Sequence, residues 1–340
     1  MKFENTQVWG FEHAFRGMRN AKNSWDKSDS FFGLVDSFDE TDYDIAAYWA
    51  EAEKPEYYGE NFGEYEDERI KLENKYDEWL LSSGILRRNP NYDIFDVAFI
   101  GPNDMELAQK LIRAGSEHRK FLRQIFVSVD ITAPLYWFKE FDTYKVGTVA
   151  NSTSTMHTIE KSPITIKNFE IDDYKDYCSF LPDFIGEEGL TADDCESMIM
   201  RFIDFLEGLR VKYLETKDKK YWKELIRWLP ESWLQTRTVT FNYENLFGMC
   251  SKGQRRFHKL NEWSGIDNPA LENFIAWART LPYAQELIFA DELWENEEKL
   301  KREKIKAFDV LINALKKNDY DVDNMSTDEV LDEIIDALNL

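Results

Sequence analysis

The stretch "RQIFVSVDITAPLYWFKEF" (Arg123–Phe141) decides the fold. Its first part alternates in character: Ile125, Val127, Val129 and Ile131 point one way, and Phe126, Ser128, Asp130 and Thr132 point the other. A period of two is typical of a β-strand with one buried face. Pro134 begins the next element, which opens with aromatic residues. We therefore expect a half-buried strand that leads directly into an aromatic segment.

Helical patterns surround this strand. Upstream, "PNDMELAQKLIRAGSEH" predicts a helix with Asn103 as its cap, Glu106 completing a capping box, and Gly115 at its end. Downstream, helical spacing recurs in residues 194–215, in a charged amphipathic segment after Gly253, and in residues 268–288, where Pro282 ends the helix. Helices outnumber strands, so the sequence predicts an α+β fold.

Composition limits the class of protein. With 340 residues, 43% of them hydrophobic, the chain can bury a large core in one domain or two. The start has no charged segment followed by an apolar leader, and no run of 18 apolar residues occurs, which predicts a soluble, cytoplasmic protein with no membrane partner. Three widely spaced cysteines predict reduced thiols, and four histidines without a ligand spacing predict no metal site.

The acidic residues are concentrated in two segments. Residues 36–79 hold 16 acidic and 4 basic side chains, and residues 291–340 hold 15 acidic and 7 basic ones, while the whole chain carries −23. We therefore expect a main domain over 1–290, interrupted by an acidic, Tyr-rich insertion at 36–95, and an acidic helical extension over 291–340. Such a surface repels the phosphate backbone of nucleic acids, which excludes a general DNA- or RNA-binding role.

Polar residues continue the aromatic segment in "YWFKEFDTYKVGTVANSTSTMH" (Tyr136–His157). A core strand does not need a run of hydroxyls and amides, and a flexible linker would not follow four aromatic residues. This stretch therefore indicates the wall of a pocket for a polar ligand. No dinucleotide, P-loop or hydrolase signature is present, so the ligand must be read from less generic residues.

Together with what surrounds it, this stretch resembles the flavin-dependent thymidylate synthases, the thymidylate synthase complementing (ThyX) family. That family has a capped helix, a turn containing His, an alternating strand, an Ala-Pro step, and then R-H-R, seven residues, S. Counted from Ala133-Pro134, the R-H-R positions hold Thr143, Tyr144 and Lys145, and the Ser position holds Thr153. His118 falls on a His that the family places near the flavin.

A second match lies downstream and follows the family's order. The family continues with R, L-P and T, and further on with R and H-x-x-x-E. This chain has Arg227, Leu229-Pro230 and Thr236, then Arg255 or Arg256, His258 and Glu262. Neither acidic segment is part of the resemblance.

The resemblance implies an α+β fold with a central, mostly antiparallel sheet flanked by helices, and a homo-oligomer. It implies reductive methylation of dUMP or a related pyrimidine deoxynucleotide, with methylene-tetrahydrofolate as carbon donor and FAD mediating hydride from NADPH. The nucleotide-binding residues would be Arg227, Arg255, Arg256, Glu140, Asn151, Thr153 and Thr155. The cofactor-binding residues would be His118, Arg123, Thr143, Tyr144, Lys145, Asn242 and His258. No catalytic residue and no metal ligand is assigned.

Departures from the family's motif leave alternatives open. Arg-His-Arg contacts the flavin in the family, whereas this chain has Thr, Tyr and Lys, and the family's nucleotide-holding Glu and later Arg fall on Asn151 and Thr155. Thr is neutral, and Lys cannot fork two hydrogen bonds to a phosphate as Arg does. One alternative is a non-catalytic nucleotide-binding or interaction protein that has lost the flavin site. Another is an assembly role carried by the acidic insertion.

Each candidate also has a plain structural interpretation. Lys145 fits a solvated strand end, Asn151–Thr155 a helix-capping turn, and His118 the end of a helix. The basic residues from 252 to 259 favour an anion site at the start of a helix, or form an exposed charged face. Arg227 is expected to be buried and paired, because it lies between two apolar residues. Cys250 fits a buried inert thiol better than an activated nucleophile.

Overall fold

The computed structural model describes residues 1–35, 86–88, 95–144, 146–171, 192–251, 256–267 and 269–317. The predictions for Lys145, Arg255 and most of the acidic insertion fall outside these residues. The chain divides into two units, residues 1–288 and 289–340. No helix within the described residues is long and apolar enough to cross a membrane.

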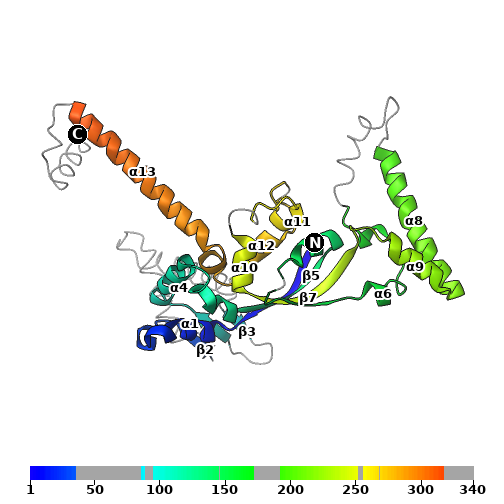
Figure 1. The fold of residues 1–340 in the computed structure, drawn as a ribbon, viewed down its shortest axis with the longest axis horizontal. Coiled ribbons are helices and arrows are strands. Elements are labelled where there is room, and N and C mark those ends of the chain that lie inside the picture. The colour runs from blue at the N-terminus through cyan, green and yellow to red at the C-terminus, as the bar shows by residue number, and fades with distance from the viewer. Residues whose placement is uncertain are drawn as a thin grey trace, which may run out of the picture. The chain divides into compact units, whose positions relative to one another are not determined.

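A four-stranded antiparallel sheet forms the centre of the first unit (Figure 1). In spatial order its strands are β1 (Lys2–Trp9), β5 (Phe126–Pro134), β7 (Leu234–Asn242) and β6 (Val149–Ser152). The expected alternation is confirmed, because Val127, Val129 and Ile131 are buried while the residues between them are more exposed. One face of the sheet is therefore apolar, and the α+β prediction is confirmed.

Short helices cover the apolar face: α5 (Leu135–Phe141), α10 (Tyr243–Cys250), α11 (Asn261–Ser264) and α12 (Phe274–Arg279). Figure 1 shows α10, α11 and α12 on the same side of the strands. The core beneath them is aromatic, since the Trp137 ring lies 5.1 Å from that of Phe141 and 5.5 Å from that of Trp263. Full burial of one such Phe side chain contributes about 1.5–3 kcal/mol, so this cluster fixes α5 and α11 against each other.

The opposite face of the sheet carries hydrogen-bonding side chains. We call it the hydroxyl face and define it by Ser128, Asp130, Thr132, Thr236, Thr238 and Thr240. Cross-strand pairs bond along it: the Thr132 and Thr236 hydroxyls lie 2.7 Å apart, and the Thr238 hydroxyl donates to Asp130 at 2.5 Å. Donation by Thr238, followed by that from Asn5, lowers the pKa of Asp130.

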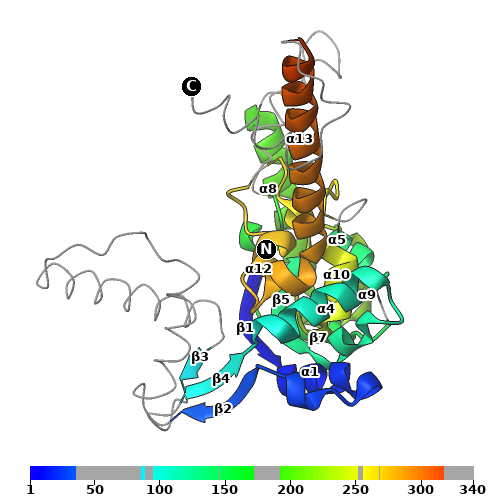
Figure 2. The same ribbon diagram turned by 90° about the vertical axis from the view of Figure 1, so that its left-hand side faces the viewer.

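A second antiparallel sheet has three short strands (Figure 2). Its order is β2 (Phe31–Val35), β4 (Phe95–Phe99) and β3 (Leu86–Arg88), so β2 and β3 both pair with β4. Residues 86–88 and Phe95, which the sequence assigned to the insertion, are strand residues. Residues 36–85 therefore connect two strands of one small sheet.

Helix α4 (Pro102–Ala114) begins at a residue other than the one expected. Its N-cap is Gly101, and the Asp29 carboxylate accepts hydrogen bonds from the backbone N–H groups of Asn103 at 2.8 Å and Asp104 at 3.1 Å. The predicted Asn103 cap and its capping box are wrong, because the helix already begins at Pro102 and Asn103 lies inside its first turn, where its own N–H donates to Asp29. The predicted end is confirmed: Gly115 is the C-cap, with φ of 113°, a conformation that favours glycine.

Helices α8 (Ala192–Thr216) and α9 (Lys219–Trp228) form a hairpin with a core of its own, and the helix predicted at 194–215 is confirmed. The buried residues of this core are Ile159, Ile164, Phe169, Ile203, Leu206, Leu225 and Trp233. Asp218 caps α9 by accepting from the Lys220 N–H at 3.0 Å.

The helices after Gly253 are shorter than the sequence pattern predicts. The helix expected after Gly253 is only the four residues of α11, and the one expected across 268–288 is divided into α12 and a π-helix, η6 (Ala284–Ile288). Pro282 lies between them and lacks the N–H that would continue a helix. The remaining elements are α1 (Phe11–Arg19), η1 (Asn20–Lys22), η2 (Trp25–Lys27), η3 (Arg119–Gln124), α6 (Thr155–Thr158) and η4 (Ile166–Asn168). The described part of the second unit is dominated by α13 (Ala290–Lys317).

Candidate functional site

The sheet separates the predicted site residues into two groups. Asn151 lies directly opposite Thr238, and residues so paired share a face, so Asn151 belongs to the hydroxyl face. Thr153 follows two residues later and points the same way. Its hydroxyl donates to the Thr236 carbonyl at 3.1 Å and accepts from the Thr236 N–H at 3.3 Å. In this chain the Thr153 side chain therefore completes the edge of the sheet.

The second group gathers on the helix-covered face, beside α5. One side of α5 is buried in the aromatic core, and Tyr136 and Glu140, four residues apart, share its polar side. The Tyr136 hydroxyl donates to the Glu262 carboxylate. Glu140 Oε1 lies 3.8 Å from His258 Nε2. We call Tyr136, Glu140, His258 and Glu262 the Glu140–His258 cluster.

Backbone contacts hold His258 in one orientation. The Leu260 N–H donates to its Nδ1 at 3.1 Å, and the Ser264 hydroxyl donates to its carbonyl at 2.6 Å. The imidazole ring lies 5.4 Å from the Trp263 ring. Because Nδ1 accepts, the neutral imidazole carries its proton on Nε2, which faces Glu140. The cluster thus presents an N–H donor beside a carboxylate acceptor, with 13% of the His258 and 29% of the Glu140 side chain exposed.

Thr143 and Tyr144, at the first two of the family's R-H-R positions, lie in the turn after α5. Thr143 is exposed, and the Tyr144 ring lies 5.7 Å from the ring of Trp263. The Thr148 hydroxyl donates to the Tyr144 carbonyl at 2.7 Å and closes the turn. Tyr144 and His258 therefore pack on the same indole, which brings two of the predicted cofactor residues together.

Asn242 has a structural role in the same region. Its side chain accepts from the Asn245 N–H at 3.0 Å, and the Asn245 side chain accepts from the Asn242 N–H at 3.2 Å, which makes a capping box for α10. The Asn245 amide also donates to the Val146 carbonyl at 2.6 Å. Asn245 thereby connects the turn after α5 to the start of α10, and the contact of Asn242 with a cofactor stays a prediction.

The basic segment before α11 contains both buried and exposed side chains. Arg256 is buried, and its Nε donates to the Cys250 carbonyl at 3.0 Å. Cys250 is fully buried, in line with the inert-thiol interpretation. By contrast, Phe257 is 58% exposed and Lys259 is exposed, so an aromatic ring and a cation flank His258 in the sequence.

The other predicted residues lie on separate elements. Arg227 is 55% exposed and pairs with Glu224 one turn earlier in α9, so its predicted burial is wrong. The reason is that α9 buries only Leu225, and Trp228 is itself 51% exposed. His118 and Arg123 are exposed at the two ends of η3, and the Thr155 hydroxyl accepts from Gln235 at 3.3 Å.

Sequence reasoning missed two partly buried cations, Arg237 and Arg119. The Arg237 guanidinium pairs with Asp142 at 2.9 Å and lies 3.9 Å from the centre of the Phe138 ring. Arg119 pairs with Glu244 at 3.0 Å. In "RTVTFN", Arg237 alternates in step with Val239 and Phe241, which are buried. A charged residue at a position of this kind could have indicated an ion pair beneath the sheet. The described residues contain no group of three or more His, Cys, Asp or Glu that could hold a metal ion.

Comparison with known proteins adds a structural likeness. No family model and no curated protein matches the chain. The chain is similar in structure to flavin-dependent thymidylate synthases. With ThyX from Helicobacter pylori, a structure in complex with FAD and dUMP, it shares 16% identity over 56% of this chain and 84% of that one, at a TM-score of 0.36. With the UMP/dUMP methylase PolB from Streptomyces cacaoi, bound with 5-Br dUMP, it shares 17% identity over 56% of this chain and 81% of that one, at a TM-score of 0.37. Function is therefore inferred from this chain's own residues.

Proposed function

We propose that this chain binds a pyrimidine nucleotide at the Glu140–His258 cluster. The observation that carries the proposal is the meeting of Glu140 and His258, 3.8 Å apart and from distant parts of the sequence. A carboxylate accepts hydrogen bonds, and the neutral imidazole donates from Nε2. This pair complements the N3–H donor and O4 acceptor at one edge of a uracil ring.

Two exposed residues beside His258 supply the other groups that a nucleotide needs. Phe257 offers an aromatic face, and stacking of a base on such a face contributes about 1–3 kcal/mol. Lys259 offers a positive point charge for the phosphate. Both side chains come from the segment that carries His258, so stacking, edge recognition and charge originate from adjacent positions.

The described residues do not fit FAD in the way that the resembled family holds it. Thr143 is an exposed neutral residue, and the Tyr144 ring packs against Trp263. Neither carries the permanent charge and forked donors with which a guanidinium binds a phosphate. A nucleotide-binding protein that has lost the flavin site is the function that this geometry supports best.

A second candidate is the reaction that the resemblance implies. This is reductive methylation of dUMP, with methylene-tetrahydrofolate as carbon donor, NADPH as hydride source and FAD as mediator. The proximity of Glu140 and His258, expected at the nucleotide and at the cofactor respectively, favours it. Incubation of the purified protein with FAD followed by desalting separates the candidates. Retained flavin absorbance supports methylation, and a colourless protein supports binding alone.

Thermal unfolding with dUMP, dCMP and dTMP tests the main proposal. We expect dUMP to raise the melting temperature progressively with its concentration, since it binds the native state. Loss of one hydrogen bond in His258→Gln or Glu140→Gln should weaken binding about tenfold. His157→Gln, an exposed histidine on α6, is the matched control and should bind as the parent does.

Two results would contradict nucleotide binding at this cluster. The first is an unchanged melting temperature with all three nucleotides at millimolar concentrations. The second is full affinity in both the His258→Gln and the Glu140→Gln variants. Either result would shift the interpretation toward an assembly role for the acidic segments.

We also propose that the chain forms a homo-oligomer. In one copy Asn151 and Thr153 lie on the hydroxyl face and Glu140 on the helix-covered face, so a site using all three needs a second copy. Light scattering across a concentration series measures the mass directly. A monomer at every concentration would leave Asn151 and Thr153 outside the nucleotide site.

A further inference from the structure

An open cleft of about 720 Å³ lies beside α1, η1, η2 and the start of α4. It shares no residue with the Glu140–His258 cluster. Its polar lining includes Arg19, Lys22, Asn23, Asp26, Lys27 and Asn103. Arg19 is paired with the buried Asp104 carboxylate, so the remaining charges of the lining are those of Lys22, Lys27 and Asp26, a net charge of +1 in a chain whose net charge is −23. The cleft is therefore a local positive site on an acidic protein, which concentrates small anions.

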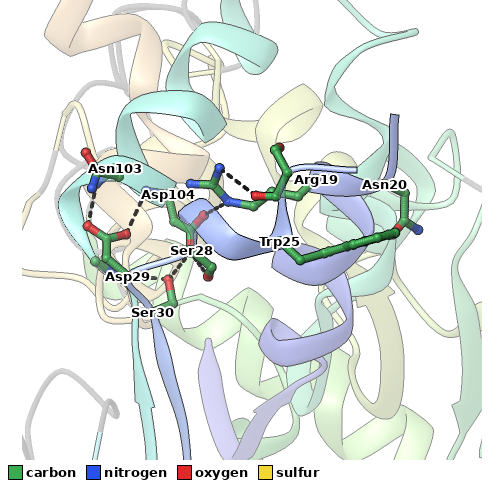
Figure 3. A network of polar contacts seen from close by, with 10 residues as sticks. Arg19, Asn20, Trp25, Ser28, Asp29, Ser30, Asn103 and Asp104 are labelled. Atoms are coloured by element: carbon green, nitrogen blue, oxygen red, sulfur yellow. Dashed lines mark hydrogen bonds and ion pairs between the residues drawn. The ribbon is translucent and has the colours of Figure 1, made fainter. Parts of the chain in front are cut away.

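Arg19 lines this cleft, and its guanidinium is held by a network of polar contacts (Figure 3). It is only 5% exposed, its Nε donates to the buried Asp104 carboxylate, and its Nη1 donates to the Ser24 carbonyl at 3.3 Å. Arginine has five N–H donors, and these bonds use two of them. Hydroxyls of Ser28 and Ser30 donate to Asp104 at 2.5 Å each and hold the carboxylate in place. The guanidinium is thus oriented before any ligand arrives.

The segment that carries the two lysines is also preformed. The Ser24 N–H donates to the Arg19 carbonyl at 3.3 Å, and the Trp25 indole donates to the Asn20 side chain at 2.9 Å (Figure 3). Asn23 has a positive φ of 47°, which reverses the chain between η1 and η2. Lys22 and Lys27 are exposed, and the described residues offer neither of them an ion pair. Their charges therefore remain available to a ligand.

We propose that this cleft binds the phosphate group of a small phosphorylated molecule. Arg19 supplies fixed, forked donors, and Lys22 and Lys27 supply point charges at the rim. The volume lies within the range of about 300–1,000 Å³ that is typical of small-molecule sites, so a whole nucleotide can enter, and not only a phosphate ion. Asp26, the one carboxylate of the lining, disfavours a ligand with negative charge spread over its whole length.

Calorimetric titration of the full chain with pyrophosphate and with ADP tests this site. We expect saturable binding that weakens with added salt, and a loss of about tenfold in the double variant Lys22→Gln/Lys27→Gln, because each exposed cation contributes up to about fivefold. Lys223→Gln, an exposed lysine on α9, is the matched control. Both lysines are exposed, so the double variant should keep the melting temperature of the parent. Arg19→Lys keeps the charge and removes the fork, and it should weaken binding further.

The two probes distinguish the sources of the phosphate. Tighter binding of ADP than of pyrophosphate indicates a nucleotide ligand, and equal binding indicates recognition of phosphate alone. Absence of saturable binding to the parent chain at millimolar concentrations would overturn the proposal, as would unchanged affinity in the double variant. The double variant should still respond to dUMP as the parent does. If the double variant loses its response to dUMP, both ligands use the same site. That result would overturn the proposal of a separate phosphate site, but not the proposal that the chain binds a nucleotide.

Discussion

Replacing Asp104 by Asn tests how strongly the first unit depends on one buried ion pair (Figure 3). The Asp104 side chain is fully buried and that of Arg19 is 6% exposed. The carboxylate accepts from the guanidinium and from the Ser28 and Ser30 hydroxyls. Asn keeps the volume of Asp and removes the charge. Arg19 would then be a buried cation without its counter-charge.

Breaking one partner of a buried pair costs about 3–5 kcal/mol, because the other charge stays desolvated. At about 2–4 °C for each kcal/mol in a large domain, the melting temperature should fall by about 6–20 °C. Replacement of both partners, Asp104→Leu with Arg19→Met, removes the charge and its desolvation cost together. This double variant should therefore recover most of the lost stability.

Equilibrium unfolding in urea, followed by tryptophan fluorescence, measures the free energy of unfolding of each variant. Asp26→Asn is the control, since Asp26 is an exposed carboxylate in the same segment and should change stability by less than about 0.5 kcal/mol. A loss below about 1 kcal/mol in Asp104→Asn is what an exposed pair would give, and it would refute the reasoning from burial.

Three further predictions concern helix ends and burial. Gly101→Ala should destabilise the fold by about 1–3 kcal/mol, because the added Cβ would lie 2.3 Å from atoms of Asp29. Gly208→Ala in α8 has open space around it and should stabilise the fold by about 0.5–1 kcal/mol. Equal effects of the two variants in urea unfolding would contradict the steric argument. Asn242→Ala should cost about 1 kcal/mol through the lost cap of α10, and an unchanged urea midpoint would show that the cap is dispensable. Burial raises the pKa of Glu286, so its charge lowers stability above the folded-state pKa, and stability is regained as the pH falls through that pKa. Glu286→Gln should therefore be more stable than the parent at neutral pH and should lose this advantage in acid, and a constant difference in midpoint across the titration would exclude the charge as the cause.

Elements with strong periodicity were predictable, and those that depend on distant residues were not. The alternation around Val129 and the helical spacing of residues 194–215 are local properties of the chain, so both elements form where expected. The start of α4 depends on Asp29, which lies 74 positions before Asn103. The sequence pattern of a helix cannot reveal a capping side chain that is supplied by a distant part of the chain.

The candidate site shows the same division. Glu140 and His258 were each expected at a ligand, but their 3.8 Å separation depends on the aromatic core that packs α5 against α11. Arg227 was expected to be buried from its apolar neighbours, yet a ten-residue helix on a small core leaves its outer face in water. Apolar neighbours in sequence do not bury a helical residue, because adjacent positions point about 100° apart.

The geometry of β7 decides how the nucleotide residues can cooperate. Successive residues of this strand point to opposite faces, so Arg237 reaches Asp142 beside α5 while Thr236 and Thr238 belong to the hydroxyl face. A ligand held by Glu140 is thus separated from Asn151 of the same copy by the sheet itself. Within one copy, recognition must come from α5 and the segment around His258. Asn151 can join that site only across an interface between copies. Replacing Asn151 should therefore weaken nucleotide binding only under conditions in which the chain is an oligomer.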